Sequence, residues 1–303
     1  MTNKRGRNFV FEPPQDLNDI LLLAKITGEE LSPLLTNHKR MYRRFESLEQ
    51  GRRFYDPNHK LRRVLGPIGI WLNKYPLSEH VDGWRKGRSH LHTAGAHTNK
   101  MQVSKVDIKA FFPSIHSLRV QSLFKDRLNC GDEASAILTK LTTADSHLPQ
   151  GFPTSPVIAN LTLKSLDAKL SKYSQSHATA VRRYGDDITA SSNVDIPNLA
   201  EDICGLVRRS GFTVNAEKLA EGGTRYADQE QEVCGIVVND GLRISDTKYK
   251  AYLDELEEPM PSVLEISAVG YQALRRRREG ILAYVRSVNP VQASLLLRAA
   301  LDV

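Results

Sequence analysis

The stretch VRRYGDDITA, residues 181–190, places two aspartates side by side at the tip of a strand–turn–strand pattern. Asp186 and Asp187 follow Gly185, and Gly and Asp are favoured turn residues, so a polar hairpin turn is one interpretation. Adjacent like charges repel each other, which points instead to a doubly positive ion held between them. The other motifs of the chain must decide between a catalytic metal and a solvated turn.

The composition is that of a basic globular protein. The chain has 303 residues, enough for one to three domains, and its net charge of +7 favours a polyanionic partner, nucleic acid first. Cys130, Cys204 and Cys234 lie far apart, which argues against a disulfide framework or a zinc ribbon and fits a reducing cytoplasm. No apolar run reaches the ~18 residues that span a bilayer, and the N-terminus lacks the apolar segment of a signal peptide. We therefore expect a cytoplasmic protein with no membrane contact.

Hydrophobic periodicity predicts alternating helices and strands. Residues 15–35 show helical spacing ended by Pro33, and residues 101–112 alternate like a half-buried strand. The remaining expected elements are helices over 117–128, 154–175 and 196–210, a hairpin over 178–192, a strand over 212–215, a second hairpin around Asn239-Asp240-Gly241, and a mostly helical tail from Ser245. This order predicts an α+β fold with helices on one face of an antiparallel sheet.

A basic segment precedes these elements. Between Lys39 and Arg63 there are nine Lys or Arg residues against three acids, interleaved with Tyr42, Phe45, Phe54 and Tyr55. A charge run can simply be a solvated face. Aromatic rings mixed with arginines favour nucleic acid, because phosphate contacts and base stacking use those two kinds of side chain.

A third carboxylate favours the metal interpretation of the GDD turn. Asp107 lies in VSKVDIKAFFPSI, residues 103–115, at an apolar strand end where an unpaired charge is costly to bury. If this strand lies beside the 178–192 hairpin, Asp107 meets Asp186 and Asp187. Such a cluster suits Mg²⁺, and two ions about 3.5–4 Å apart are the device for in-line phosphoryl displacement.

Four motifs in order resemble the palm of reverse transcriptases. They are VDIKAFFPSI (106–115), LPQGFPTSP (148–156) with Asn160, YGDD (184–187) and GFTVNAEK (211–218). The resemblance covers roughly residues 40–245. It implies a right-hand polymerase fold, with N-terminal helices and fingers over 1–100, a palm over 101–245 that includes a fingers portion around 117–155, and a helical thumb over 246–303.

Further stretches resemble the bacterial retron reverse transcriptases. Thr93-Ala94-Gly95-Ala96-His97 is similar to the retron motif Asn-Ala-x-x-His, and VCGIVVNDG (233–241) is similar to a Val-Thr-Gly segment. Thr93, Cys234 and Gly185 depart from the retron pattern, which usually has Asn, Thr and Ala at these positions.

The resemblance assigns roles to individual residues. Asp107, the Ile108 carbonyl, Asp186 and Asp187 would hold two Mg²⁺ ions, with Mn²⁺ as a substitute. Phe112 would abut the sugar of the incoming nucleotide and select dNTPs, because a phenyl ring leaves no room for a 2′-hydroxyl. The other nucleotide contacts would be Gln150 at the sugar and base, Arg52 and Arg53 at the phosphates, and Lys218 as proton donor to the pyrophosphate. Each of these residues also has an ordinary structural interpretation, such as a core ring, a loop amide or a surface cation.

RNA and primer contacts are expected at Arg43, Arg44, His97, Arg275, Arg276 and Arg278. His90, His92 and His97 have no cysteine or further carboxylate at ligand spacing, which argues against zinc. We expect these histidines to contact RNA or to cap the structure beside the palm. Arg275–Arg278 would belong to the thumb, where some arginines face solvent and others meet the template–primer backbone.

The resemblance implies an RNA-directed DNA polymerase that copies part of a structured non-coding RNA into a branched RNA–DNA hybrid (msDNA). The implied partners are the RNA template, dNTPs, an effector protein encoded nearby in an antiphage defence system, and host RNase H for RNA removal. One alternative is a reverse transcriptase of another bacterial defence or group II intron-related lineage. Another is a non-catalytic RNA-binding scaffold that retains the fold.

Overall fold

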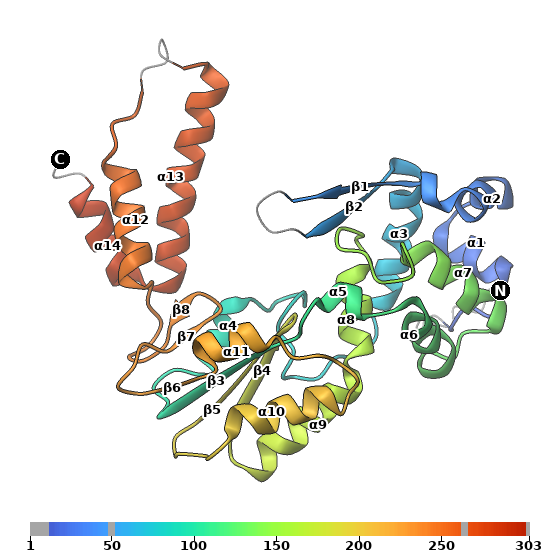
Figure 1. Cartoon of the computed structure of the whole chain (residues 1–303). Coiled ribbons are helices and arrows are strands. Elements are labelled where there is room, and N and C mark those ends of the chain that lie inside the picture. Colours follow the sequence, from blue (N-terminus) through green and yellow to red (C-terminus); the bar gives the residue numbers. More distant parts are fainter. Residues whose placement is uncertain (1–11, 48–51, 262–265, 301–303) are drawn as a thin grey trace, which may run out of the picture. The chain divides into compact units, whose positions relative to one another are not determined.

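The computed structural model describes residues 12–47, 52–261 and 266–300, and the chain forms two compact units (Figure 1). The first unit comprises residues 1–81, 108–169 and 209–213, and the second comprises residues 82–107, 170–208 and 214–303. Each unit is therefore assembled from separate stretches of sequence. No helix within the described ranges is both long enough and apolar enough to cross a membrane.

The first unit is mainly helical. Its elements are α1 (Leu17–Ala24), α2 (Gly28–Thr36), the 3₁₀ turn η1 (His38–Arg40), β1 (Tyr42–Glu46), β2 (Arg53–Pro57), α3 (His59–Leu72), α5 (Phe111–Ser114), α6 (Ser117–Ser122), the π-helical η2 (Leu123–Arg127), α7 (Asp132–Thr142) and α8 (Ser155–Thr162). Helix α3 packs against α1, α7 and α8. Leu61, Leu65 and Ile68 are fully buried, and Trp71 stacks on Phe124 with ring centroids 6.4 Å apart. The core of this unit is thus built around α3.

Part of the basic segment, residues 42–57, contains the two strands of a β-hairpin in the first unit. Strands β1 and β2 pair antiparallel with Phe45 opposite Phe54, and the two rings stack at 5.6 Å. The backbone N–H of Tyr55 donates to the carbonyl of Gln150 at 2.8 Å, which joins β2 to the LPQG loop. A Cβ on Gly151 would lie 2.3 Å from the Tyr55 carbonyl oxygen, so this close approach requires glycine.

Two of the expected helices are each divided in two. The helix predicted over 15–35 is α1 and α2, because Lys25 adopts a left-handed conformation and Thr27 starts a new helix with a capping box. Pro33 lies inside α2 and does not end it. The helix predicted over 154–175 is α8 followed, after Leu163, by α9 (Lys164–Ser176).

The second unit contains a four-stranded antiparallel sheet of order β4-β5-β3-β6. Its elements are α4 (His90–Gly95), β3 (Gln102–Asp107), β4 (Ala180–Tyr184), β5 (Asp187–Ser192), α10 (Leu199–Arg208), α11 (Ala216–Gly222), β6 (Thr224–Tyr226), β7 (Glu232–Val233), β8 (Ile236–Val237), α12 (Asp246–Glu257), α13 (Ala268–Val288) and α14 (Pro290–Ala299). The hairpin predicted over 178–192 is confirmed as β4 and β5. Val237 and Arg243 exchange two backbone hydrogen bonds, so the turn around Asn239–Gly241 is confirmed too.

Strand β3 is more buried than its alternating sequence predicts. Every residue of β3 except the half-buried Lys105 is buried. Helix α10 packs against β3 and β5, and Val103 joins an apolar cluster with Val233, Ile236 and Val285. The strand is therefore enclosed, and the half-buried expectation was wrong because it counted only one covering layer.

The segment predicted as a strand over 212–215 is not a regular strand, because it has no ladder of successive pairs. It nevertheless follows the end of β3, where the backbone N–H of Asn215 donates to the Asp107 carbonyl at 2.8 Å. That contact places the start of α11 beside the carboxyl end of β3.

Candidate active site

The three aspartates converge at one end of the sheet in the second unit. Strand register sets Asp107 of β3 directly opposite Asp187 of β5, and Asp186 lies in the turn between β4 and β5. One carboxylate oxygen from each residue lies within 4.8 Å of the others. Directly opposed residues on neighbouring strands project from the same face, so the register itself brings Asp107 and Asp187 together.

The turn that carries Asp186 depends on glycine. Gly185 has φ +70°, a left-handed conformation that side chains with a Cβ rarely adopt. A Cβ on Gly185 would also lie 2.9 Å from Cη2 of Trp84. In turn, a Cβ on Gly83 would lie 2.4 Å from the backbone nitrogen of Gly185. Gly83 and Trp84 are thus fitted closely to the back of the catalytic turn.

A buried arginine fixes the same turn from within the sheet. Arg183 on β4 has no solvent exposure, and its Nη1 donates to the Gly185 carbonyl at 2.9 Å. Its own carbonyl accepts from the backbone N–H of Asp82 at 3.0 Å. Arg183 therefore links the turn before Asp186 to the segment that contains Trp84.

Asp82 forms a second buried polar centre that the sequence did not reveal. Its side chain is fully buried, and Oδ2 accepts from the Thr93 hydroxyl at 3.1 Å. Guanidinium nitrogens of Arg88 and Arg182 lie 3.7 and 3.9 Å from Oδ1. Thr93 thus has a structural role at the position where the retron motif has Asn. A single Asp offers no periodic or motif signal, so sequence reasoning could not have found this centre.

Asp107 is held by two residues of the GFTVNAEK motif. Asn215 Nδ2 donates to Oδ1 at 3.1 Å, and Lys218 Nζ donates to Oδ2 at 2.7 Å. Partial burial alone would lower the pKa of Lys218, but the hydrogen bond and charge of Asp107 outweigh it and raise that pKa. The ammonium therefore stays protonated beside the carboxylates. Asn215 lies inside a motif that the sequence had already flagged, although its side chain was not singled out.

Burial and the neighbouring carboxylates shift the pKa of Asp187. Desolvation first, and then the charge of Asp186, raise the pKa of Asp187 to about 7, while Lys218 opposes the shift. Without a cation, the cluster therefore carries less than its full negative charge at neutral pH. Hard divalent cations prefer carboxylate oxygens as ligands, and a bound cation would offset the repulsion between these closely spaced groups.

A pocket of about 460 Å³ adjoins this cluster within the second unit. Asp107, Asp187 and Lys218 line it together with Cys234. Burial raises the pKa of the Cys234 thiol to about 12, so this cysteine stays protonated and is a poor metal ligand. The Val-Cys-Gly segment thus contributes shape to the site rather than a reactive thiolate.

His97, which is expected to contact RNA, is buried in this structure. The His97 side chain has no solvent exposure, and its Nδ1 lies 2.6 Å from the Ser191 hydroxyl of β5. Burial, followed by the charges of Arg182 and Lys100, lowers the pKa of His97 to about 3, so the ring is neutral. His92 contacts the backbone N–H of Ser89 at 3.2 Å and caps α4. These two histidines therefore follow the structural alternative.

The nucleotide-binding candidates of the first unit lie on β2, α5 and the LPQG loop. Arg52 and Arg53 are both exposed, and Arg53 donates to Glu46 across the hairpin at 3.1 Å. Gln150 is partly buried behind Tyr55, and Phe112 is partly buried next to Phe111 with ring centroids 5.3 Å apart. Leu48 and Glu49, which stand where the family often has a lysine, lie outside the described ranges. The roles of these side chains stay predictions.

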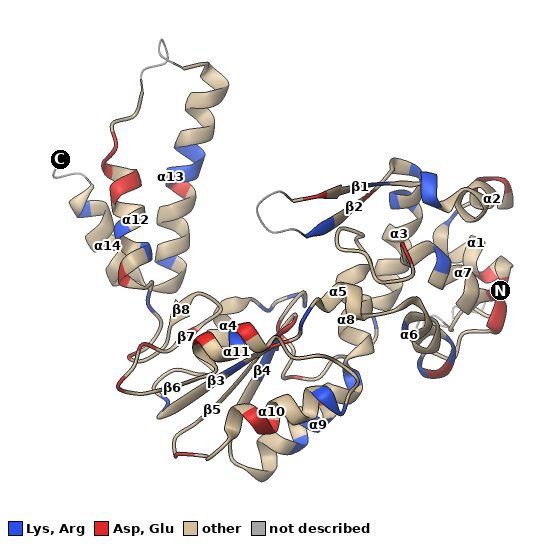
Figure 2. Cartoon of the chain, viewed as in Figure 1, with Lys and Arg blue, Asp and Glu red and all other residues tan. Residues whose placement is uncertain are grey.

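The arginines expected to bind RNA differ in their present partners. Arg43 pairs with Asp56 at 3.1 Å and Arg44 with Asp145 at 3.2 Å. On α13, a run of basic residues is visible in Figure 2. There Arg275 pairs with Glu279, Arg277 pairs with Glu255 of α12, and Arg278 donates to the Glu258 carbonyl. Arg276 makes no hydrogen bond or ion pair with any described residue. Phosphate binding by the paired arginines would therefore require exchange of partners.

Gly185→Ala should disturb the catalytic turn. The added methyl group meets Trp84, and alanine must adopt the left-handed conformation that glycine tolerates at this position, so the free energy of unfolding should fall by about 1–3 kcal/mol. Urea unfolding measures this loss, and Gly95→Ala, where no heavy atom lies within 4 Å, is the matched control. Combining Gly185→Ala with Trp84→Leu should recover part of the loss. If the changes in the free energy of unfolding of the two single variants simply added in the double variant, the contact between Trp84 and the turn would be contradicted.

Divalent-cation binding should strengthen as pH rises from 6 to 8. A raised folded-state pKa of about 7 means that Asp187 is largely protonated at pH 6, so a cation must displace a proton. For the metal-free protein the sign is opposite. The stabilising contribution of this carboxyl is complete below its unfolded pKa of about 4 and is lost as pH rises through 7. Thermal unfolding with and without Mg²⁺ measures both trends, and Asp187→Asn should flatten them.

Comparison with known proteins identifies the family. Residues 72–271 match the family model described as reverse transcriptase (RNA-dependent DNA polymerase). The retron Ec86 reverse transcriptase of Escherichia coli is 28% identical over 81% of this chain and 78% of its own length. The retron Mx65 enzyme of Myxococcus xanthus is 31% identical, over 76% and 56%, and the retron Se72 enzyme of Salmonella heidelberg is 26% identical, over 96% and 79%. The chain therefore belongs to the reverse transcriptase family, the RNA-directed DNA polymerases of mixed α+β polymerase fold, and is of the retron type.

Proposed function

We propose that this reverse transcriptase copies part of a structured non-coding RNA into a branched RNA–DNA hybrid, msDNA, and acts with a nearby-encoded effector in antiphage defence. The observation that carries the polymerase part is the convergence of Asp107, Asp186 and Asp187 on one sheet face. The retron-like motifs around His97 and Cys234, together with the retron relatives, support the branched product. The implied substrates are dNTPs and the RNA template.

The carboxylates are assigned to two Mg²⁺ ions, with Mn²⁺ as a substitute. Asp107, Asp186, Asp187 and the Ile108 carbonyl would hold them. The bound ions would supply an activated primer hydroxyl and a stabilised pyrophosphate leaving group. Lys218 would then protonate or pair with the departing pyrophosphate. Its raised pKa supports the pairing role, because the side chain stays a cation at neutral pH.

The first unit would bind the incoming nucleotide. Arg52 and Arg53 are assigned to the phosphates, Gln150 to the sugar and base, and Phe112 to the 2′ position. The hydrogen bond between Tyr55 and Gln150 supports a shared function, because it ties the arginine strand to the LPQG loop. In the present structure Glu46 occupies Arg53, so a triphosphate would have to replace that carboxylate.

RNA and primer would contact the remaining basic residues. Arg43 and Arg44 belong to the proposed fingers region (1–100), and Arg275, Arg276 and Arg278 to the proposed thumb (246–303). The exposed Arg276 supports the thumb assignment, since a cation without a described partner can neutralise a phosphate directly. The proposed palm spans 101–245, and removal of copied RNA is assigned to host RNase H.

The departures from the retron pattern have local explanations. Gly185 accommodates Trp84, and Thr93 donates to the buried Asp82. Cys234 adopts φ +51° beside the 460 Å³ pocket.

The decisive experiment purifies the protein with its co-expressed upstream RNA, Mg²⁺ and all four dNTPs. The parent should yield RNase-resistant DNA joined to RNA at a branch. Asp186→Asn should lower the yield by at least about 100-fold, because a lost metal ligand removes several kcal/mol of transition-state stabilisation. The exposed Asp228→Asn is the matched control and should retain full activity. Linear DNA alone would refute branching, and absence of DNA would refute polymerisation of this RNA.

Phe112→Val should admit ribonucleotides. Removing the ring opens space for a 2′-hydroxyl, so the ratio of rNTP to dNTP incorporation should rise at least about tenfold, which corresponds to about 1.4 kcal/mol. Single-nucleotide extension of a primed RNA template measures this ratio. Phe45→Val, which removes an equally large ring from β1, should leave the ratio unchanged. An unchanged ratio in Phe112→Val would remove this residue from the nucleotide site.

A further inference from the structure

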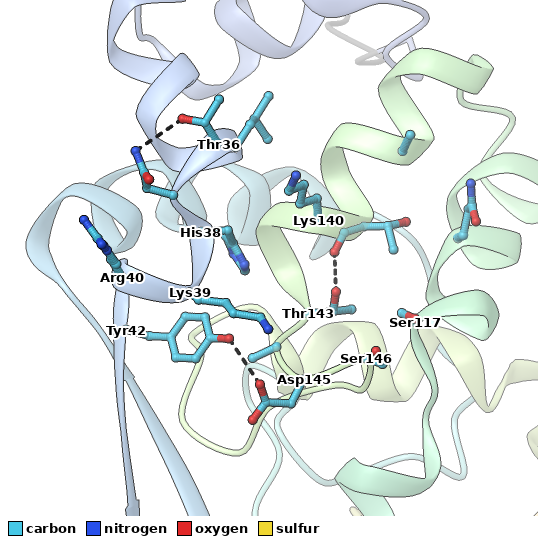
Figure 3. Close-up of a pocket in the computed structure, with 16 residues that line it drawn as sticks. Thr36, His38, Lys39, Arg40, Tyr42, Ser117, Lys140, Thr143, Asp145 and Ser146 are labelled. Carbon is cyan, nitrogen blue, oxygen red and sulfur yellow. Dashed lines mark hydrogen bonds between the residues drawn. The ribbon is translucent and has the colours of Figure 1, made fainter.

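A polar pocket in the first unit shares no residue with the carboxylate cluster. Its volume is about 680 Å³, and its walls come from residues 35–42 on one side and from residues between 117 and 146 on the other (Figure 3). The first wall precedes residue 72, where the match to the reverse transcriptase family begins. The second wall lies within that match, so the pocket combines residues inside the matched region with residues that precede it.

The pocket has an excess of positive charge. Lys39, Arg40 and Lys140 line it, and none of the three forms an ion pair with a residue in the described parts of the chain. Asp145 is the single carboxylate among the lining residues. Its Oδ2 already accepts from Arg44 at 3.2 Å and from the Tyr55 hydroxyl at 3.0 Å. The three cations are thus left without local compensation.

The cations are arranged around the pocket rather than on one helix face. Lys140 belongs to α7, whereas Lys39 and Arg40 belong to η1. Figure 3 shows Lys39 extending toward the turn of Asp145 and Ser146, with Arg40 pointing outward at the rim. Two ammonium groups on opposing walls, with a guanidinium at the rim, suit a chain of phosphates better than a single small anion.

Neutral aromatic groups complete the surface. His38 and Tyr42 make an edge-to-face contact with ring centroids 5.4 Å apart. Burial, and then the charge of Lys140, lower the pKa of His38, so its ring stays neutral at physiological pH. Its Nε2 is shielded from solvent and has no hydrogen-bond partner among the described residues. Aromatic side chains beside uncompensated cations are the combination that proteins use to bind single-stranded nucleic acids, through contacts to bases and to phosphates.

We infer that this pocket binds the phosphate backbone of a single-stranded RNA segment, with Lys39 and Lys140 as the main phosphate contacts, Arg40 at the rim and Tyr42 beside a base or sugar. The site goes beyond the proposed polymerase function, because it anchors RNA through residues that have no part in nucleotide addition. A folded duplex fits less well, since the pocket is a local hollow and not an extended groove.

The test removes the three cations together in the full-length protein. Binding of an unstructured oligoribonucleotide to Lys39→Gln/Arg40→Gln/Lys140→Gln is measured by fluorescence anisotropy at several salt concentrations. Each lost phosphate contact lowers the slope of log affinity against log salt by about 0.7, so the slope should shrink by about 1–2. The matched control, Lys25→Gln/Lys164→Gln/Lys172→Gln, removes the same charge from exposed lysines outside the pocket and outside the basic segment 39–63.

The outcomes distinguish specific RNA binding in the pocket from non-specific attraction of RNA to a basic protein. A larger slope change and weaker binding in the pocket variant than in the control support the inference. Equal effects in both variants, or no effect in either, overturn it. Competition by inorganic phosphate or a nucleoside triphosphate at the affinity of the RNA would also overturn it, because the pocket would then be a free-anion site. Thermal unfolding of each variant verifies that it is folded.

Failure of this inference differs from failure of the proposed function. Extension of a DNA primer on a short RNA template, at saturating concentrations, should survive in the pocket variant, since none of the three substituted residues is among those assigned to the nucleotide or the metal ions. Asp186→Asn should show the reverse, with parental RNA binding and no extension. Loss of extension in the pocket variant would place these lysines in the catalytic apparatus and contradict a separate anchoring role.

Discussion

Three carboxylates held with oxygens within 4.8 Å of one another form the constraint on which the second unit depends. Their repulsion must be met by a cation, by protons, or by both, and two features of the cluster meet part of it. Lys218 places an ammonium 2.7 Å from Asp107, and the pKa of Asp187 rises to about 7. A divalent cation would neutralise the carboxylates more fully than one ammonium and a proton do. The remaining repulsion between the carboxylates therefore favours metal binding.

Holding like charges together requires a stiff support, and the protein builds it from buried polar groups. Arg183 and Asp82 are both fully buried behind the turn, and each makes specific contacts with neighbouring backbone or side chains. Burying a charge costs desolvation free energy, which only a paired and hydrogen-bonded arrangement offsets. Here they attach the segment of Trp84 to the turn before Asp186. The support therefore fixes where the carboxylates point.

The parts that the sequence could predict are those set by local pattern. The hairpin of β4 and β5 follows from turn chemistry and alternation, and the aspartates follow from motif spacing. The break between α1 and α2 was missed because a helical period of leucines continues across Thr27. The burial of His97 and the network of Asp82 were missed for a deeper reason. Both depend on which strands and helices meet in three dimensions, and single residues leave no period or spacing to read.

The Gly185 position shows why a motif letter cannot be interpreted alone. A search for the retron pattern scores glycine there as a departure, yet the departure is matched by Trp84, whose indole occupies the space that an alanine methyl would need. Trp84 itself has φ +54°, an uncommon conformation for a bulky residue, and Gly83 beside it allows the close approach to the turn. Gly83 and Trp84 thus pack against Gly185, which lies far away in the sequence, and the three residues fit together sterically. A chain with alanine at the turn must shape the 83–84 segment differently, so these positions are expected to change together and the catalytic aspartates can stay in place while they do.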